Sequence, residues 1–98
     1  PTGFVASVRS WLRQFDRAAL VREALNRRKP SEQNPVGVEL LISGGEAAEF
    51  GPDCRCTGRV VADEGNRIVL IDIQFFGRNG ERAIESGDRP LSDIVRFI

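Results

Sequence analysis

Two cysteines are the side chains of this 98-residue chain that come closest to a metal-binding motif. Cys54 and Cys56 are separated by one residue, so on a β-strand both thiols point to the same face. A tetrahedral zinc site needs four ligands, and the chain has no other cysteine and no histidine. Two copies of the chain could share one site by giving two thiolates each. The more economical interpretation is a pair of small strand residues that bind no metal.

Acidic residues are numerous, but general acid–base catalysis requires two carboxyl groups held in different environments. Carboxylates in turns are normally solvated, and most of those here fall in predicted turns or loops. Asp72 is the exception because it lies in an apolar strand pattern, where burial would require an arginine partner or an edge position. The glycines of the stretch SGGEAAEFG are not followed by the Gly-Lys-Ser/Thr ending of a phosphate loop. We therefore expect no enzymatic activity and no cofactor.

Positive charge is concentrated near the N-terminus. Residues 1–30 carry seven cations and two acids, for a net charge of +5, whereas residues 31–98 carry seven cations and twelve acids, for −5. Arginine forks can bind the phosphates of nucleic acid without reading its sequence. The alternative interpretation is a solvated helix face whose last turn is favoured by cations. The candidate nucleic-acid-binding residues are Arg9, Arg13, Arg17, Arg27, Arg28 and Lys29.

The elements that must position these cations begin with a helix. Apolar residues recur at spacings of three, four and seven from Phe4 to Leu25, and only Arg22 interrupts this stripe. The pattern predicts a helix from Phe4 to Arg28 that ends before Pro30. We assign residues 1–30 to an amphipathic basic helix and residues 31–35 to a linker.

From residue 36 onward the apolar period changes to two, which is typical of β-strands. Within the predicted strand 67–76, both faces begin apolar: Val69, Ile71, Ile73 and Phe75 would share one face, and Ile68 and Leu70 the other. Such a strand would be covered on both sides, by a barrel interior and by the helix or another subunit. The strands are expected at residues 36–43, 54–62, 67–76, 81–85 and 93–98, with a turn at Gly44-Gly45 and an irregular segment at 46–53.

Residues 36–98 resemble the Sm-like small β-barrels, which include LSm and YolD-like proteins. TGRVVADEGNRIVLID is similar to the bent central hairpin of that fold, and RPLSDIVRFI is similar to its closing strand. The resemblance implies a mainly β fold: a five-stranded antiparallel Sm-like or SH3-like small barrel after one N-terminal α-helix. The chain lacks the Arg-Gly or Lys-Gly pair that usually precedes the closing strand, so we transfer the fold and not RNA binding.

These features predict a non-enzymatic binding or assembly module, associated with nucleic acid through the basic helix. The alternative is a protein-interaction or adaptor module whose helix docks on a partner or a neighbouring subunit. Open barrel edges favour a homo-oligomer. The longest apolar run, Ile68 to Ile71, is too short to span a membrane, and no signal peptide is evident. We therefore expect a cytoplasmic protein without a membrane partner.

Overall fold

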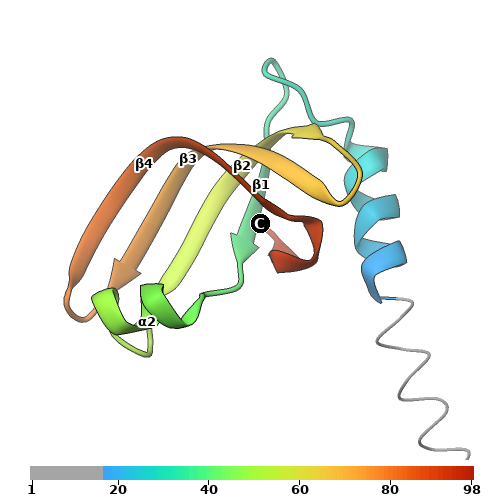
Figure 1. Ribbon diagram of the computed structural model, residues 1–98. Coiled ribbons are helices and arrows are strands. Elements are labelled where there is room, and N and C mark those ends of the chain that lie inside the picture. The colour runs from blue at the N-terminus through green and yellow to red at the C-terminus, as the bar shows by residue number, and fades with distance from the viewer. Residues whose placement is uncertain (1–16) are drawn as a thin grey trace, which may run out of the picture.

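The computed structural model describes residues 17–98 and contains an N-terminal helix followed by a five-stranded antiparallel sheet (Figure 1). Residues 17–28 are helical, and the first part of the predicted helix lies outside the described residues. The prediction of a mainly β fold with one N-terminal helix is confirmed. The remaining elements are β1 (Val36–Leu40), α2 (Gly44–Phe50), β2 (Arg55–Asp63), β3 (Arg67–Gly77), β4 (Gly80–Pro90), η1 (Leu91–Asp93) and β5 (Ile94–Phe97).

The strands lie in the order β4-β3-β2-β1-β5, and every neighbouring pair is antiparallel. The long strands β2, β3 and β4 curve from α2 at one end of the molecule to the N-terminal helix at the other (Figure 1). The outermost strands, β4 and β5, do not pair with each other within residues 17–98. The sheet is therefore open, and the expected closure into a barrel is not seen.

A β-bulge at Asp72 changes which side chains of β3 face the core. Ile68 and Leu70 are buried, and the next buried residues are Ile73 and Phe75, three and five positions after Leu70. Asp72 adopts a left-handed φ of 52°, and the register between β2 and β3 shifts there. One extra residue reverses the alternation of side chains along a strand.

The predicted division of β3 into two faces was therefore wrong. Ile68 and Leu70 lie on the core side together with Ile73 and Phe75, whereas Val69 and Ile71 are only half-buried. The bulge changes the phase after Ile71, so the second half of the strand turns its other set of alternate residues toward the core.

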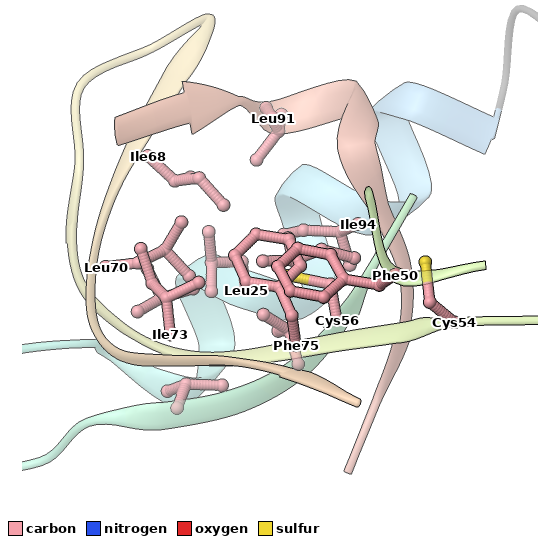
Figure 2. Close-up of a cluster of buried hydrophobic side chains, with 14 residues drawn as sticks. Leu25, Phe50, Cys54, Cys56, Ile68, Leu70, Ile73, Phe75, Leu91 and Ile94 are labelled. Atoms are coloured by element: carbon pink, nitrogen blue, oxygen red, sulfur yellow. The ribbon is translucent and has the colours of Figure 1, made fainter. Parts of the chain in front are cut away.

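One hydrophobic core joins the sheet, the N-terminal helix and α2 (Figure 2). Leu25 of the helix is fully buried in this cluster, and burying a leucine side chain contributes about 2 kcal/mol. At the other end, the ring of Phe50 from α2 stacks on Phe75 with a centroid separation of 5.2 Å. The helix and α2 are thus fixed to the same sheet. The core residues are Leu25, Val36, Val38, Leu40, Phe50, Cys54, Cys56, Val60, Ile68, Leu70, Ile73, Phe75, Leu91 and Ile94.

The short helix α2 occupies a segment that the sequence interpretation treated as a turn and an irregular stretch. Ser43 and Glu46 form a capping box, in which the Glu46 amide donates to Ser43 Oγ at 3.4 Å and the Ser43 amide donates to Glu46 Oε2 at 2.7 Å. The Ser-Gly-Gly-Glu sequence carries this signature. The adjacent glycines were read as a turn instead, and the helix was missed.

Strand β4 is longer than the predicted segment 81–85. It runs from Gly80 to Pro90 and pairs with β3 in one continuous register. Gly87 and Pro90 are residues that usually mark turns, but Gly87 sits close to the Ile73 side chain and Pro90 ends an edge strand.

The segment 31–35 ties the helix to β1. Lys29 has a left-handed φ of 50°, which is the usual conformation just after a helix C-terminus. The Asn34 side-chain amide donates to the carbonyl oxygens of Arg28 at 2.9 Å and Lys29 at 3.2 Å. These bonds satisfy carbonyl groups that the helix end leaves without partners.

Candidate nucleic-acid interface

Two of the predicted cations, Arg17 and Arg28, lie against β5. Arg17 Nη2 donates to the carbonyl oxygen of Ile94 at 2.8 Å. The Arg28 guanidinium lies 4.1 Å from the centroid of the Phe97 ring and also donates to the Ala24 carbonyl oxygen at 2.9 Å. One flank of the helix is therefore held along the edge strand by arginines whose partners are neutral.

The other candidate cations do not contact β5 in the described part of the chain. Arg27 is on an exposed part of the helix, where it pairs with Glu23 at 3.4 Å. Lys29 is exposed just after the helix. Both residues line a shallow open depression that also includes Arg22. Arg9 and Arg13 lie outside residues 17–98, so the predicted stripe is described only in part.

Arg22 lies beside Arg27 and Lys29, although it was not among the predicted site residues. Its Nη2 donates to the Asn66 side-chain oxygen at 3.1 Å and to the Gly65 carbonyl oxygen at 3.4 Å, both in the turn between β2 and β3. The sequence signal was present, because Arg22 is the one residue that interrupts the apolar stripe. A polar residue within such a stripe faces the body of the protein.

The arginines of the sheet region have a different kind of partner. All seven arginines of residues 31–98 lie within ion-pair distance of a carboxylate. Among residues 17–30, Arg27 alone has such a partner within the part of the chain that the structure describes. The sheet-region pairs are Arg55–Glu39, Arg59–Asp72, Arg67–Asp88, Arg78–Asp53, Arg82–Glu49, Arg89–Glu46, Arg89–Asp93 and Arg96–Glu39.

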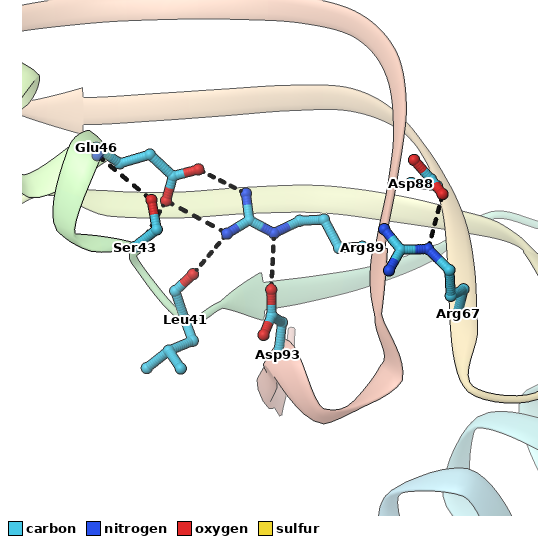
Figure 3. A network of polar contacts seen from close by, with 7 residues as sticks. All are labelled: Leu41, Ser43, Glu46, Arg67, Asp88, Arg89 and Asp93. Atoms are coloured by element: carbon cyan, nitrogen blue, oxygen red, sulfur yellow. Dashed lines mark hydrogen bonds and ion pairs between the residues drawn. The ribbon is translucent and has the colours of Figure 1, made fainter.

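The most enclosed of these pairs is centred on Arg89 (Figure 3). Its guanidinium donates to both carboxylate oxygens of Glu46, at 2.8 and 3.3 Å, to Asp93 Oδ2 at 3.1 Å and to the Leu41 carbonyl oxygen at 2.9 Å. Burial acts to raise the pKa of Glu46, but hydrogen bonds from Arg89 and Ser43 outweigh it and the pKa is lowered. This network joins β4, α2 and η1, so its role is structural.

Asp72 has an arginine partner, as expected for a carboxylate within an apolar strand. The Asp72 side chain is nevertheless exposed. Its carboxylate lies 3.4 Å from Arg59 Nη1, and more than half of each side chain is accessible to solvent. The bulge turns this side chain away from the core, which is why no buried charge results.

Cys54 and Cys56 both lie in the core beneath α2. Burial raises the pKa of the Cys56 thiol to about 11, so this thiol is protonated near neutral pH. Within residues 17–98, no group of three or more histidine, cysteine, aspartate or glutamate side chains is arranged to hold a metal ion. Both side chains are buried members of the hydrophobic core.

Two further findings bear on the class of protein. No helix in the described part of the chain is long and apolar enough to cross a membrane. No family model, curated protein or solved structure matches this chain. The functional proposal therefore depends on the geometry of the charges.

Proposed function

We propose that this chain is a non-enzymatic binding module that associates with nucleic acid through the cations of its N-terminal helix. The observation that supports it is the contrast in pairing: sheet-region arginines contact carboxylates, whereas Arg17, Arg22 and Arg28 contact neutral groups. A guanidinium that donates to a carbonyl or amide oxygen keeps its full charge and several free N–H donors. Those donors suit phosphate oxygens.

The docking of the helix strengthens this proposal. Leu25 anchors the helix in the core, and the neutral contacts of Arg17 and Arg22 fix two guanidinium groups relative to the sheet. Cations that are already ordered lose less conformational freedom when they bind a ligand. The acidic sheet region would repel phosphates, so nucleic acid would approach from the helix side.

The proposed binding is electrostatic and independent of base sequence. Stacking of single-stranded bases needs exposed aromatic rings, and the ring beside the helix cations, that of Phe97, is already covered by Arg28. Phe76 is 40% exposed, but it lies next to the β3–β4 turn and away from these cations. Contacts from arginine and lysine to phosphates instead release counterions and make the affinity depend on salt.

We also propose that the scaffold is related to the Sm-like small barrels. Three features support this relationship: the strand order, the bend of the long strands at the Asp72 bulge, and the short turn of η1 before the last strand. The open sheet is the feature that differs from a closed barrel.

The second candidate is a protein-interaction module, favoured by one observation. Leu20 lies on the docked helix with 61% of its surface exposed, although the face carrying Leu25 is buried against the chain's own sheet. A protein partner would cover this leucine, and its binding would persist after nuclease treatment and at high salt.

Fluorescence anisotropy with a labelled single-stranded and a labelled duplex oligonucleotide tests the proposal. At low salt we expect binding to both, with little preference among unrelated sequences. Absence of binding to either oligonucleotide at low salt would reject the nucleic-acid proposal and leave protein interaction as the remaining candidate.

A further inference from the structure

The two edges of the sheet differ in how they are covered. At the β5 edge, Arg17 donates a hydrogen bond to the Ile94 carbonyl oxygen and Arg28 lies over the Phe97 ring. The N-terminal helix therefore runs along this strand. At the β4 edge, every residue from Gly80 to Ser86 is exposed. One edge is therefore occupied by the chain itself, and the other is open in the described part of the chain.

The register of the β3–β4 hairpin identifies the backbone groups that point out from the open edge. Gly77 pairs with Gly80 across the two-residue turn Arg78–Asn79, so these two residues exchange hydrogen bonds. Bonded and non-bonded pairs then alternate along an antiparallel ladder, and Ile84 bonds to Ile73. The backbone N–H and C=O groups of the intervening residues point away from β3. These residues are Glu81, Ala83 and Glu85; beyond them the bulge at Asp72 reverses the alternation, so Gly87 turns its backbone groups back toward Leu70 of β3.

From this geometry we propose that β4 pairs antiparallel with β4 of a second copy of the chain, with Ile84 at the two-fold axis. An open edge is a template for another strand. Because the β5 edge is covered, copies cannot add head to tail, and the open edge is left to pair with its own equivalent. The product is a closed dimer with two-fold symmetry.

The side chains select this register. With Ile84 at the axis, Ile84 of each copy faces Ile84 of the other, and the 38% of its surface that is exposed can be buried there. Ala83 then lies opposite Glu85 of the second copy and can form backbone hydrogen bonds with it. An axis at Ala83 would place Glu81 opposite Glu85, and an axis at Glu85 would place two glutamates opposite each other. Both arrangements are disfavoured by repulsion.

The proposal is independent of nucleic-acid binding, since it uses the opposite edge of the sheet. The sequence predicted only a homo-oligomer, whereas this proposal names the strand that pairs, β4, and the register of the pairing. The pairing covers only a few residues, and small interfaces are typical of weak association.

Cysteine cross-linking tests the register. Residues in a non-bonded antiparallel pair have Cα atoms about 4.5 Å apart, a separation that a disulfide spans. We expect Ile84→Cys to give a disulfide-linked dimer under mild oxidation. The matched control is Ala83→Cys on the same edge, because the two copies of residue 83 would be separated by more than about 7 Å. The wild-type chain is the second control, since Cys54 and Cys56 are buried.

Ala83→Pro provides an independent test by light scattering. Its N–H points away from β3, so proline removes a hydrogen bond to the second copy but none of the hairpin. We expect a dimer for the wild type and a folded monomer for the proline variant at the same concentration. A wild type that is monomeric at about 1 mM would overturn the proposal. Equal cross-linking at positions 83 and 84, or a dimer unchanged by the proline, would also overturn it.

Discussion

Arg17 donates a hydrogen bond of 2.8 Å to the main-chain carbonyl oxygen of Ile94, which lies 77 positions further along the chain. This contact joins the first described turn of the N-terminal helix to the last strand of the sheet. It contributes to two properties together, because it occupies a backbone group at the β5 edge and fixes a guanidinium group that has no carboxylate partner among residues 17–98.

We expect Arg17→Ala to destabilise the protein by about 1 kcal/mol, since a partly buried hydrogen bond from a charged donor is lost. The matched control is Arg27→Ala, which removes an exposed helical ion pair with Glu23 and should change the free energy of unfolding by less than about 0.5 kcal/mol. Urea unfolding measures both. Equal effects of the two substitutions would contradict a docking role for Arg17.

The Arg89 network should contribute more than any other ion pair of the sheet region. The Arg89 and Glu46 side chains are only 15% and 20% exposed, so Arg89→Met leaves a largely enclosed carboxylate without its main partner. We expect a loss of about 2 kcal/mol in the free energy of unfolding. Arg67→Met, which disrupts an exposed pair with Asp88, is the control and should leave the unfolding midpoint nearly unchanged. Similar midpoints for the two variants would refute this ranking.

The stability that Glu46 provides should be lost in acid. Its pKa is lowered in the folded state from an ordinary value of 4.5, because hydrogen bonds from Arg89 and Ser43 outweigh burial. A lowered pKa stabilises the fold fully above the unfolded-state value, and this contribution disappears as the pH falls through the folded-state value. We expect the stability difference between wild type and Glu46→Gln to be constant near neutral pH and to shrink below about pH 4.5. Urea unfolding across a pH series measures it, and a difference that grows in acid would contradict the assignment.

The bulge at Asp72 predicts an unusual ranking of substitutions. Its φ of 52° is costly for most residues but free for glycine, so Asp72→Gly should be neutral or stabilising despite the loss of the exposed contact with Arg59. Asp72→Val should destabilise by about 1–2 kcal/mol, because a branched side chain is strained in the left-handed region. Thermal unfolding of both variants decides the point. A more stable valine variant would exclude the bulge.

The period of the apolar residues was enough to predict the helix at residues 17–28 and the approximate positions of all five strands. It could not predict the bulge, because Asp72 breaks the alternation locally and the apolar run from Ile68 to Ile71 fits either face of a strand. It also could not predict that β4 continues through Gly87, because a glycine followed by Asp88 and Pro90 is typical of a turn.

The sequence was enough to predict most of the cations that belong to the candidate site, but not which partner each of them contacts. Counting charges located the cations near the N-terminus, yet their partners depend on contacts between distant segments, such as Arg22 with Asn66. The short helix α2 was a different kind of omission. The Ser43 and Glu46 capping signature was present in the sequence, and the adjacent glycines concealed it.

The most direct test of the central claim compares two pairs of substitutions that remove the same charge from the two halves of the protein. Arg22→Gln with Lys29→Gln removes two cations of the helix region, and Arg59→Gln with Arg67→Gln removes two arginines that contact carboxylates. The measurement is the affinity for a duplex oligonucleotide, by anisotropy, over a series of salt concentrations.

Each lost phosphate contact lowers the slope of log affinity against log salt by about 0.9 for duplex DNA. We predict that the helix pair reduces the slope by up to about 1.8 and weakens binding to all sequences alike, while the sheet pair leaves the slope unchanged. An unchanged slope in the helix pair, or an equal reduction in both pairs, would contradict the assignment of nucleic-acid binding to the helix.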